Sequence, residues 1–167
     1  MFSDLIDKHR IARAEIDSWR GRLIDYFARG ETAVAQTLVC AADNGRKINL
    51  RHFAGQRLDD LMALAKTEPG TDRQNAAFTS ALDAWRLLEA RRVFLAHGNV
   101  SEWLDQRGNW AAIFDVRIYK SGVVQHERWA ATKSDADAFE AAAIAGFKSM
   151  SGQLGVFRTR MKASAAK

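Results

Sequence analysis

The chain has 167 residues, of which 25 are Lys or Arg and 20 are Asp or Glu, and its net charge is +5. This length suits one domain with a sizeable core, and the single cysteine, Cys40, excludes an intramolecular disulfide and fits a reducing compartment. The N-terminal segment is charged from its fourth residue, and no run approaches the ~18 apolar residues of a membrane span. We therefore expect a cytoplasmic protein with no membrane contact.

The N-terminal part of the chain predicts two helices. Over residues 5–26, apolar side chains recur at spacings of three, four and seven residues, which mark one face of a long amphipathic helix. This helix should end near Arg29, because Gly30 follows it. A second helix should begin at Thr32 and stop near Asn44-Gly45.

The next two helices are predicted on either side of a break at Pro69-Gly70. The third helix carries an apolar face formed by Phe53, Leu58, Leu61, Met62 and Ala65. Thr71 and Gln74 form a capping-box pattern, so a fourth helix should start there, run to about His97 and stop at Gly98. Its apolar stripe consists of Phe78, Ala81, Leu82 and Trp85.

Beyond residue 109 the pattern changes from the helical period to period two. Residues 110–119 alternate in this way and predict a strand, and residues 123–130 should form its returning partner. Lys120-Ser121-Gly122 suits the loop between them, with the glycine in the left-handed conformation. Ser134 should then cap a last long helix. The apolar face of that helix consists of Phe139, Phe147, Met150 and Leu154.

These elements predict a single all-α domain over residues 1–167. We expect an up-and-down bundle of about five helices, with one β-hairpin over about 109–131 inserted before the last helix. A lone hairpin is marginal in water, so this one should lie on the bundle or on another chain. Trp19 and Trp85 fall on predicted core stripes. The other tryptophans are candidates for stacking on nucleobases, namely Trp103, Trp110 and Trp129.

The end of the fourth predicted helix, LLEARRVFLAHG, carries charges where its apolar stripe should continue. The stripe leads to Glu89 and Arg92, with His97 at the helix end. Charged side chains are rarely buried unless paired, and Glu89 and Arg92 are three residues apart on the predicted helix. One interpretation is therefore an internal ion pair. Leu87 and Phe94 fall on the opposite side, which predicts a helix covered on both sides, either within the bundle or by a second copy.

The pattern Arg92-Val-Phe-Leu-Ala-His97-Gly98 resembles the motif of HEPN (higher eukaryotes and prokaryotes nucleotide-binding) domains. The resemblance implies a homodimer in which two motif helices meet and line one cleft with two Arg and two His side chains. Catalytic members of this family are metal-independent endoribonucleases, in which a ribose 2′-hydroxyl attacks the adjacent phosphate. The resemblance thus implies cleavage of single-stranded RNA by Arg92 and His97, supported by Glu89 or Arg91. Imidazole exchanges a proton near neutral pH, and guanidinium binds phosphate oxygens.

Two points leave alternatives open. The family usually has a polar residue directly after the Arg, and this chain has Val93 there; counting from Arg91 makes the next residue polar but lengthens the spacing. The chain is therefore expected to be either a toxin-like endoribonuclease, with an antitoxin as a candidate partner, or a non-catalytic dimer that binds a nucleotide, a nucleic acid or a protein. We expect no cofactor, and the scattered His9, His52 and His126 predict no metal site.

The positive net charge is concentrated at the C-terminal end. No acidic residue follows Glu140, whereas five basic residues do, and this number equals the net charge. In the basic tail, about residues 158–167, Arg158, Arg160 and Lys162 are candidates for binding the phosphates of a nucleic acid. The alternative is a solvated chain end.

Overall fold

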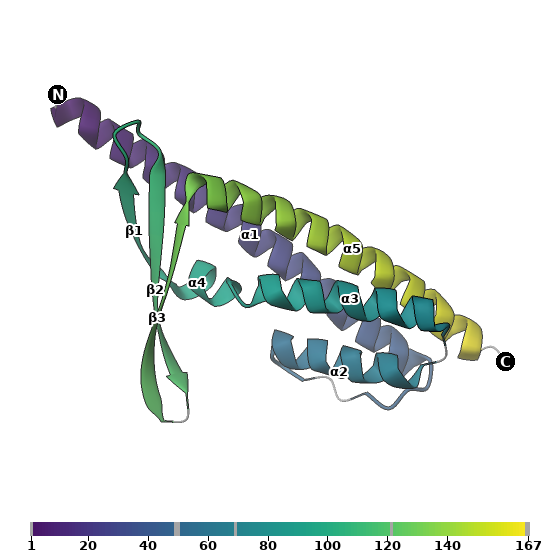
Figure 1. Cartoon of the computed structure of the whole chain (residues 1–167). Helices are drawn as coiled ribbons and strands as arrows, with labels where there is room; N and C mark the ends of the chain where they lie inside the picture. The colour runs from purple at the N-terminus through teal and green to yellow at the C-terminus, as the bar shows by residue number, and fades with distance from the viewer. Residues whose placement is uncertain (1, 49–50, 69, 121, 166–167) are drawn as a thin grey trace. The chain divides into compact units, whose positions relative to one another are not determined.

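The computed structural model describes residues 2–48, 51–68, 70–120 and 122–165 (Figure 1). In chain order the elements are α1 (Phe2–Asp43), α2 (Ala54–Thr67), α3 (Asp72–Glu89), α4 (Arg92–His97), β1 (Asn99–Leu104), β2 (Trp110–Lys120), β3 (Val123–Thr132) and α5 (Lys133–Ala165). The strands form one antiparallel sheet of order β1-β2-β3. The predicted all-α bundle of five helices is therefore wrong, because the described residues hold four long helices, the six-residue α4 and a three-stranded sheet.

The contacts divide the chain into two compact units. The first unit comprises Met1–Asp25 and Ala90–Ala142, and the second comprises Tyr26–Glu89 and Ala143–Lys167, each as far as its residues are described. The sheet and α4 belong to the first unit, α2 and α3 belong to the second, and α1 and α5 contribute a part to each. The single domain over residues 1–167 stays a prediction.

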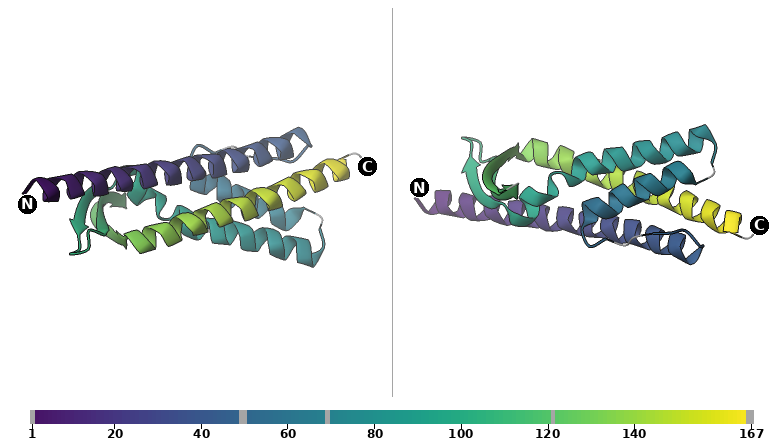
Figure 2. Two further views of the ribbon diagram at one scale, coloured as in Figure 1. Left: turned by 90° about the horizontal axis from the view of Figure 1, so that it is seen from above. Right: turned by 90° about the horizontal axis from the view of Figure 1, so that it is seen from below.

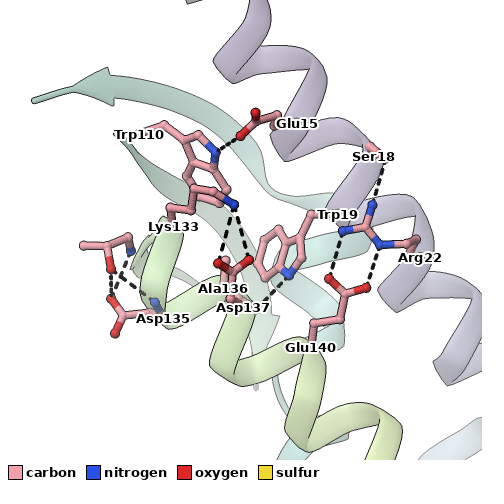
Figure 3. A network of polar contacts seen from close by, with 11 residues as sticks. Glu15, Ser18, Trp19, Arg22, Trp110, Lys133, Asp135, Ala136, Asp137 and Glu140 are labelled. Carbon is pink, nitrogen blue, oxygen red and sulfur yellow. Dashed lines mark hydrogen bonds and ion pairs between the residues drawn. The ribbon is translucent and has the colours of Figure 1, made fainter. Parts of the chain in front are cut away.

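One face of the sheet carries the core of the first unit. The residues of β2 that point to this face are buried from Trp110 to Val116, and Ile118 farther along is half-buried; the buried ones are Trp110, Ala112, Phe114 and Val116. Trp19 of α1 is 2% exposed, and its ring centroid lies 5.9–6.2 Å from those of Trp110, Phe114 and Trp129. Its indole donates a hydrogen bond of 3.0 Å to the carbonyl of Ala136 in α5 (Figure 3). Trp19 is thus a core residue as predicted, and two of the three stacking candidates, Trp110 and Trp129, belong to the same aromatic cluster.

The hairpin of β2 and β3 confirms the period-two prediction. The strands pair along residues 111–120 and 123–132. Gly122 in the turn has a φ of 80°, the left-handed conformation expected of it, and Ser121 lies outside the described residues. Figure 2 shows the sheet nearly end-on beside the N-terminal part of α1.

The strand β1 was not predicted. It pairs with β2 from Asn99 opposite Asp115 to Leu104 opposite Trp110. The carboxylate of Asp105 holds the connecting loop, because it accepts hydrogen bonds of 2.8 Å from two backbone N–H groups of the turn. The hydrogen bond from the Asn109 side chain is the largest cause of the lowered pKa of Asp105, and the two backbone hydrogen bonds add to it.

The helix α5 begins at Lys133 and is capped by Thr132, so the prediction of Ser134 as the cap is wrong. The hydroxyl of Thr132 accepts a hydrogen bond of 3.2 Å from the backbone N–H of Asp135. In return, the Asp135 carboxylate accepts one of 3.0 Å from the Thr132 backbone and one of 2.6 Å from its hydroxyl. These hydrogen bonds lower the pKa of Asp135, with the side-chain bond as the largest cause. The last residue of β3 therefore also starts α5.

Polar contacts join α1 of the first unit to β2 and α5 (Figure 3). Trp110 Nε1 donates a hydrogen bond of 2.8 Å to Glu15, and Arg22 donates bonds of 2.6 and 2.8 Å to the two oxygens of Glu140. The Arg22 hydrogen bonds lower the pKa of Glu140, more than burial raises it. The hydrogen bond of Trp110 thereby ties β2, the strand that α4 contacts, to α1.

In the second unit, α1 continues through Gly30, so the predicted helix end there is wrong. Gly30 is buried, and a Cβ placed on it would lie 2.3 Å from Cζ2 of Trp85 in α3. Trp85 is 2% exposed, and its ring centroid lies 5.4 Å from that of Phe27 and 6.2 Å from that of Phe147. The glycine therefore lets the indole approach α1, while the predicted stop near Asn44-Gly45 is confirmed.

The helices α2 and α3 lie side by side in this unit (Figures 1 and 2). The buried residues of α2 are Leu58, Leu61, Leu64 and Ala65; of the predicted face, Phe53 is exposed and Met62 is half-buried. The predicted stripe of α3 is buried in full, at Phe78, Ala81, Leu82 and Trp85. Thr71 and Gln74 exchange hydrogen bonds of 3.0 and 3.3 Å, which confirms the predicted capping box.

Candidate functional site

The helix α4 carries both residues of the candidate motif, and it is separate from α3. The regular α-helix is interrupted by a turn at Ala90–Arg91, so the single helix predicted to run from Thr71 to His97 is wrong. The reason lies in the phase of the apolar residues: at about 100° per residue, a straight helix would place Phe94 about 180° around the axis from Trp85, the last residue of the buried stripe. The interruption lets Phe94 and Leu95 pack together in the first unit.

The inward side of α4 is anchored to the sheet. Phe94 is 4% exposed and Leu95 is 1% exposed, and the Phe94 ring centroid lies 6.1 Å from that of Trp129. Arg20 of α1 donates hydrogen bonds of 3.1 and 2.7 Å to the Leu95 carbonyl, so it occupies an acceptor that the helix end leaves open. Burial lowers the pKa of Arg20, which remains a cation.

Gly98 follows α4 as its predicted C-terminal stop. Its backbone N–H donates a hydrogen bond of 2.9 Å to the Phe94 carbonyl. A Cβ at this position would lie 2.3 Å from that same carbonyl oxygen and 3.2 Å from Cβ of Phe114. Only glycine therefore lets the chain pass so closely over β2, and this passage sets where His97 stands.

The outward side of α4 presents Arg92, Val93, Ala96 and His97. Successive rotations of about 100° place these four on the half of the helix opposite Phe94 and Leu95. Arg92 and Val93 are half-buried, whereas Ala96 and His97 are exposed. No hydrogen bond or ion pair of the His97 side chain occurs among the described residues. The structure thus brings Arg92 and His97 to one small surface with two apolar residues between them.

The two predicted supporting residues differ in their positions. Arg91 lies directly before α4, and its guanidinium stands 5.9 Å from the ring centroid of Phe94 and 5.4 Å from that of Trp129. Glu89 is the last residue of α3 and belongs to the second unit. The three-residue spacing of Glu89 and Arg92 therefore does not lie on one continuous helix. Leu87 is 77% exposed, so the described residues of one copy do not cover this side of the predicted helix, and cover by a second copy stays a prediction.

Two arginines near α4 were missed by sequence reasoning. Arg13 donates hydrogen bonds of 3.3 and 3.4 Å to the Val100 carbonyl and to Glu102 in β1. Arg20 binds the end of α4, as described above. The available signal was their spacing of seven residues, which puts both on one face of α1. They position the chain on either side of His97.

The three basic residues predicted to bind nucleic acid lie on α5 in the second unit. Arg158 donates a hydrogen bond of 2.7 Å to the buried hydroxyl of Thr37, and Arg160 reaches Asn75 at 3.2 Å. Lys162 lines a cavity of about 710 Å³ with residues of α1 and α2. Residues 158–165 thus continue α5, and residues 166–167 lie outside the described part. The predicted apolar face of α5 is buried at Met150 and Leu154, and half-buried at Phe139 and Phe147.

Other groups with chemical potential are few in the described part of the chain. Within the described ranges, no group of three or more His, Cys, Asp or Glu side chains could hold a metal ion, and no helix is long and apolar enough to cross a membrane. Cys40 is a free, half-buried thiol. No protein-family model, no curated protein and no solved structure matches this chain. The candidate site therefore rests on the geometry of α4 and on the resemblance of its motif.

Proposed function

We propose that the protein is a metal-independent endoribonuclease that cleaves single-stranded RNA at a cleft formed by two copies of α4. The observation that supports this proposal is the outward surface of α4, where Arg92 and His97 flank Val93 and Ala96. The inward residues Phe94 and Leu95 are buried, so they fix which side of α4 faces outward. Small apolar residues at its centre suit a close approach of a second α4.

The two polar side chains have complementary roles. In the reaction, the 2′-hydroxyl loses a proton as its oxygen attacks the adjacent phosphorus, and the departing 5′-oxygen gains one. One His97 of the dimer takes the first proton and the other supplies the second, which is why two copies are needed. Arg92 binds the phosphate oxygens as negative charge builds on them.

A second candidate function is a non-catalytic dimer that binds a nucleotide, a nucleic acid or a protein. Val93 favours it, because the HEPN motif usually has a polar residue at this position. An antitoxin partner stays a prediction under the first function. Both functions share the α4 contact and differ only in whether His97 transfers protons.

The test of cleavage uses an unstructured RNA of mixed sequence incubated with pure protein in excess EDTA. Wild type should yield fragments that end in 2′,3′-cyclic phosphate, and His97→Ala should yield none. His52→Ala is the matched control, because His52 is also exposed but lies in the second unit. Intact RNA with wild type, or equal cleavage by His97→Ala, would contradict the proposal.

The test of the shared cleft is the mass of the protein in solution. Ala96 is exposed, so Ala96→Glu leaves the packing of a single copy intact and places a like charge at the centre of the α4 contact. Light scattering should show a dimer for wild type and a monomer for Ala96→Glu, and the variant should lose cleavage. A monomeric wild type that still cleaves would refute the two-copy site.

A further inference from the structure

The sheet has a second face, which we call the outer face, that the core of the first unit does not use. Residues directly opposite one another on neighbouring strands share a face. The register therefore assigns Trp103, Ala111 and Thr132 to one row of the outer face, and Arg117 opposite His126 and Tyr119 opposite Val124 to two others. Ala111 is half-buried and the other six are exposed. The residues that alternate with them are buried in β2 as far as Val116, whereas Gln125 and Glu127 of β3 are exposed.

Aromatic side chains stand at both ends of the outer face. Trp103 is 64% exposed and Tyr119 is 80% exposed. Along β2 their rows are separated by residues 111–119, which at ~3.3 Å per residue span about 26 Å. Exposed aromatic rings on an open sheet are the surfaces on which single-stranded nucleic acids stack their bases. The spacing accommodates several nucleotides.

The charge between these aromatic ends is positive. Arg117 and His126 are directly opposite each other, and neither has an acidic partner among the described residues. Two basic side chains in this arrangement destabilise a sheet when both are charged, and a bound phosphate would remove that cost. The one acidic residue of the described outer face is Asp115, which forms an ion pair of 2.7 Å with Arg128. The face is therefore complementary to a polyanion.

A cavity of about 670 Å³ adjoins the Trp103 end of the outer face. Trp103 forms one side of it, and Lys133 and Asp137 from the start of α5 form another. Asp105, Asn109, Thr132 and Ser134 also belong to its polar lining. This volume lies in the range of small-ligand sites, and the exposed Asp137 carboxylate and the Asn109 amide oxygen can accept hydrogen bonds from the amino and imino groups of bases. Figure 3 shows Lys133 and Asp137 beside Trp110 at this end of the sheet.

We propose that the outer face binds single-stranded RNA, with bases stacked on Trp103 and Tyr119, phosphates held by Arg117 and His126, and one base entering the cavity beside Trp103. This inference rests on the proposed function, since it assigns the surface that holds the RNA substrate. Asn99 is the first residue of β1 and lies on the outer face, and His97 is two residues before it in the sequence. A strand that leaves the outer face at this end of β1 therefore reaches the candidate cleavage site.

The test measures binding by fluorescence anisotropy, using a labelled 2′-O-methyl RNA of about twelve nucleotides, a length that exceeds the span of the face. This RNA lacks the attacking hydroxyl, so cleavage does not interfere. Trp103→Ala and Tyr119→Ala should each weaken binding roughly 5- to 150-fold, the effect of losing one stacked base. Arg117→Gln should lower the slope of log K against log salt by about 0.7.

Matched controls are available on other surfaces. Phe53→Ala removes an aromatic ring that is 71% exposed, and Arg10→Gln removes a cation whose side chain is 79% exposed. Both should bind RNA as wild type does. Melting curves check that each variant is folded, which the exposure of the changed side chains leads us to expect.

The outcomes separate this inference from the proposed function. Binding that depends on Trp103 and Tyr119, with or without cleavage of natural RNA, supports the outer face. Binding that is unchanged in these variants while wild type cleaves RNA overturns the outer face and leaves the enzyme. Wild type that binds no RNA overturns both. A change of molecular mass in Trp103→Ala with unchanged RNA binding would show instead that the face contacts a second copy.

Discussion

Gly21 and Gly30 lie on the same helix, α1, and replacement by alanine should have opposite effects at the two positions. A Cβ at Gly21 would meet nothing within 4 Å. At Gly30 it would lie 2.3 and 2.8 Å from two atoms of the Trp85 indole. These distances are too short for a carbon contact, so either Trp85 or the helix must move. Trp85 is 2% exposed among other aromatic rings and cannot turn aside freely.

Two effects of known size decide the outcome. Alanine in place of glycine inside a helix stabilises it by about 1 kcal/mol, and this gain applies at both positions. Overpacking of a core costs about 1–3 kcal/mol, and this cost applies only at Gly30. Gly21→Ala should therefore raise the free energy of unfolding by about 1 kcal/mol. Gly30→Ala should lower it by about 1–2 kcal/mol, because the rigid indole places the cost at the upper end of that range.

The assay is unfolding of both variants by urea. If the free energy of unfolding depends on urea concentration with the same slope in both, a difference in midpoint reports a difference in stability. A smaller ring should relieve the overlap, so Gly30→Ala should destabilise a Trp85→Leu background less than wild type. A double-mutant cycle of Gly30→Ala and Trp85→Leu measures this coupling energy. If Gly30→Ala proved as stable as Gly21→Ala, the close approach of α1 and Trp85 would be refuted, and with it the explanation of why α1 does not end at this glycine.

Two further predictions concern the first unit. The pKa of Glu140 is lowered from its ordinary value of about 4.5 by Arg22, so the stabilisation by this pair is complete above that pH and is lost as pH falls through the lowered pKa. At neutral pH, wild type should therefore unfold at a higher denaturant concentration than Glu140→Gln, and this difference should disappear in acid. A difference that persists in acid would contradict a stabilising ion pair between Arg22 and Glu140. Gly98→Ala should lower the free energy of unfolding by about 3 kcal/mol, because the added Cβ meets the Phe94 carbonyl, which is backbone and cannot turn aside. Gly55→Ala, where a Cβ has open space, is its control, and equal melting curves for the two would argue against the tight passage.

Much of the fold could be predicted where a local pattern determined the structure. The stripe of α3 and the hairpin of β2 and β3 follow from periods of 3.6 and two residues, which one segment displays by itself. The strand β1 escaped prediction because Glu102 occupies an inward position, where an apolar residue would have revealed the alternation. Its carboxylate is satisfied there by Arg13, 89 residues away in sequence. Gly30 was misread for the same kind of reason, since only the approach of a distant tryptophan explains it.

The candidate site was predictable in its residues but not in its setting. The spacing of Arg92 and His97 marked both positions, and Gly98 marked the end of the helix, as the structure has it. The change of phase between Trp85 and Phe94 is visible in the sequence, where it predicts one helix covered on both sides. A change of phase also allows a break, which the structure has at Ala90–Arg91. Likewise, the basic residues of α5 gave no sign that Arg158 would bind Thr37.

The two proposals place different demands on the first unit. One copy of α4 offers one imidazole, whereas proton transfer to and from the two oxygens of the reaction requires an acid and a base, so cleavage needs a second copy. The outer face needs none, because Trp103, Arg117 and Tyr119 belong to a single sheet. A single copy would thus bind RNA, and a pair of copies would cut it. The two surfaces are joined at the extended residue Gly98, where the absence of a side chain lets His97 lie beside β1, the edge strand of the sheet that would bind the RNA.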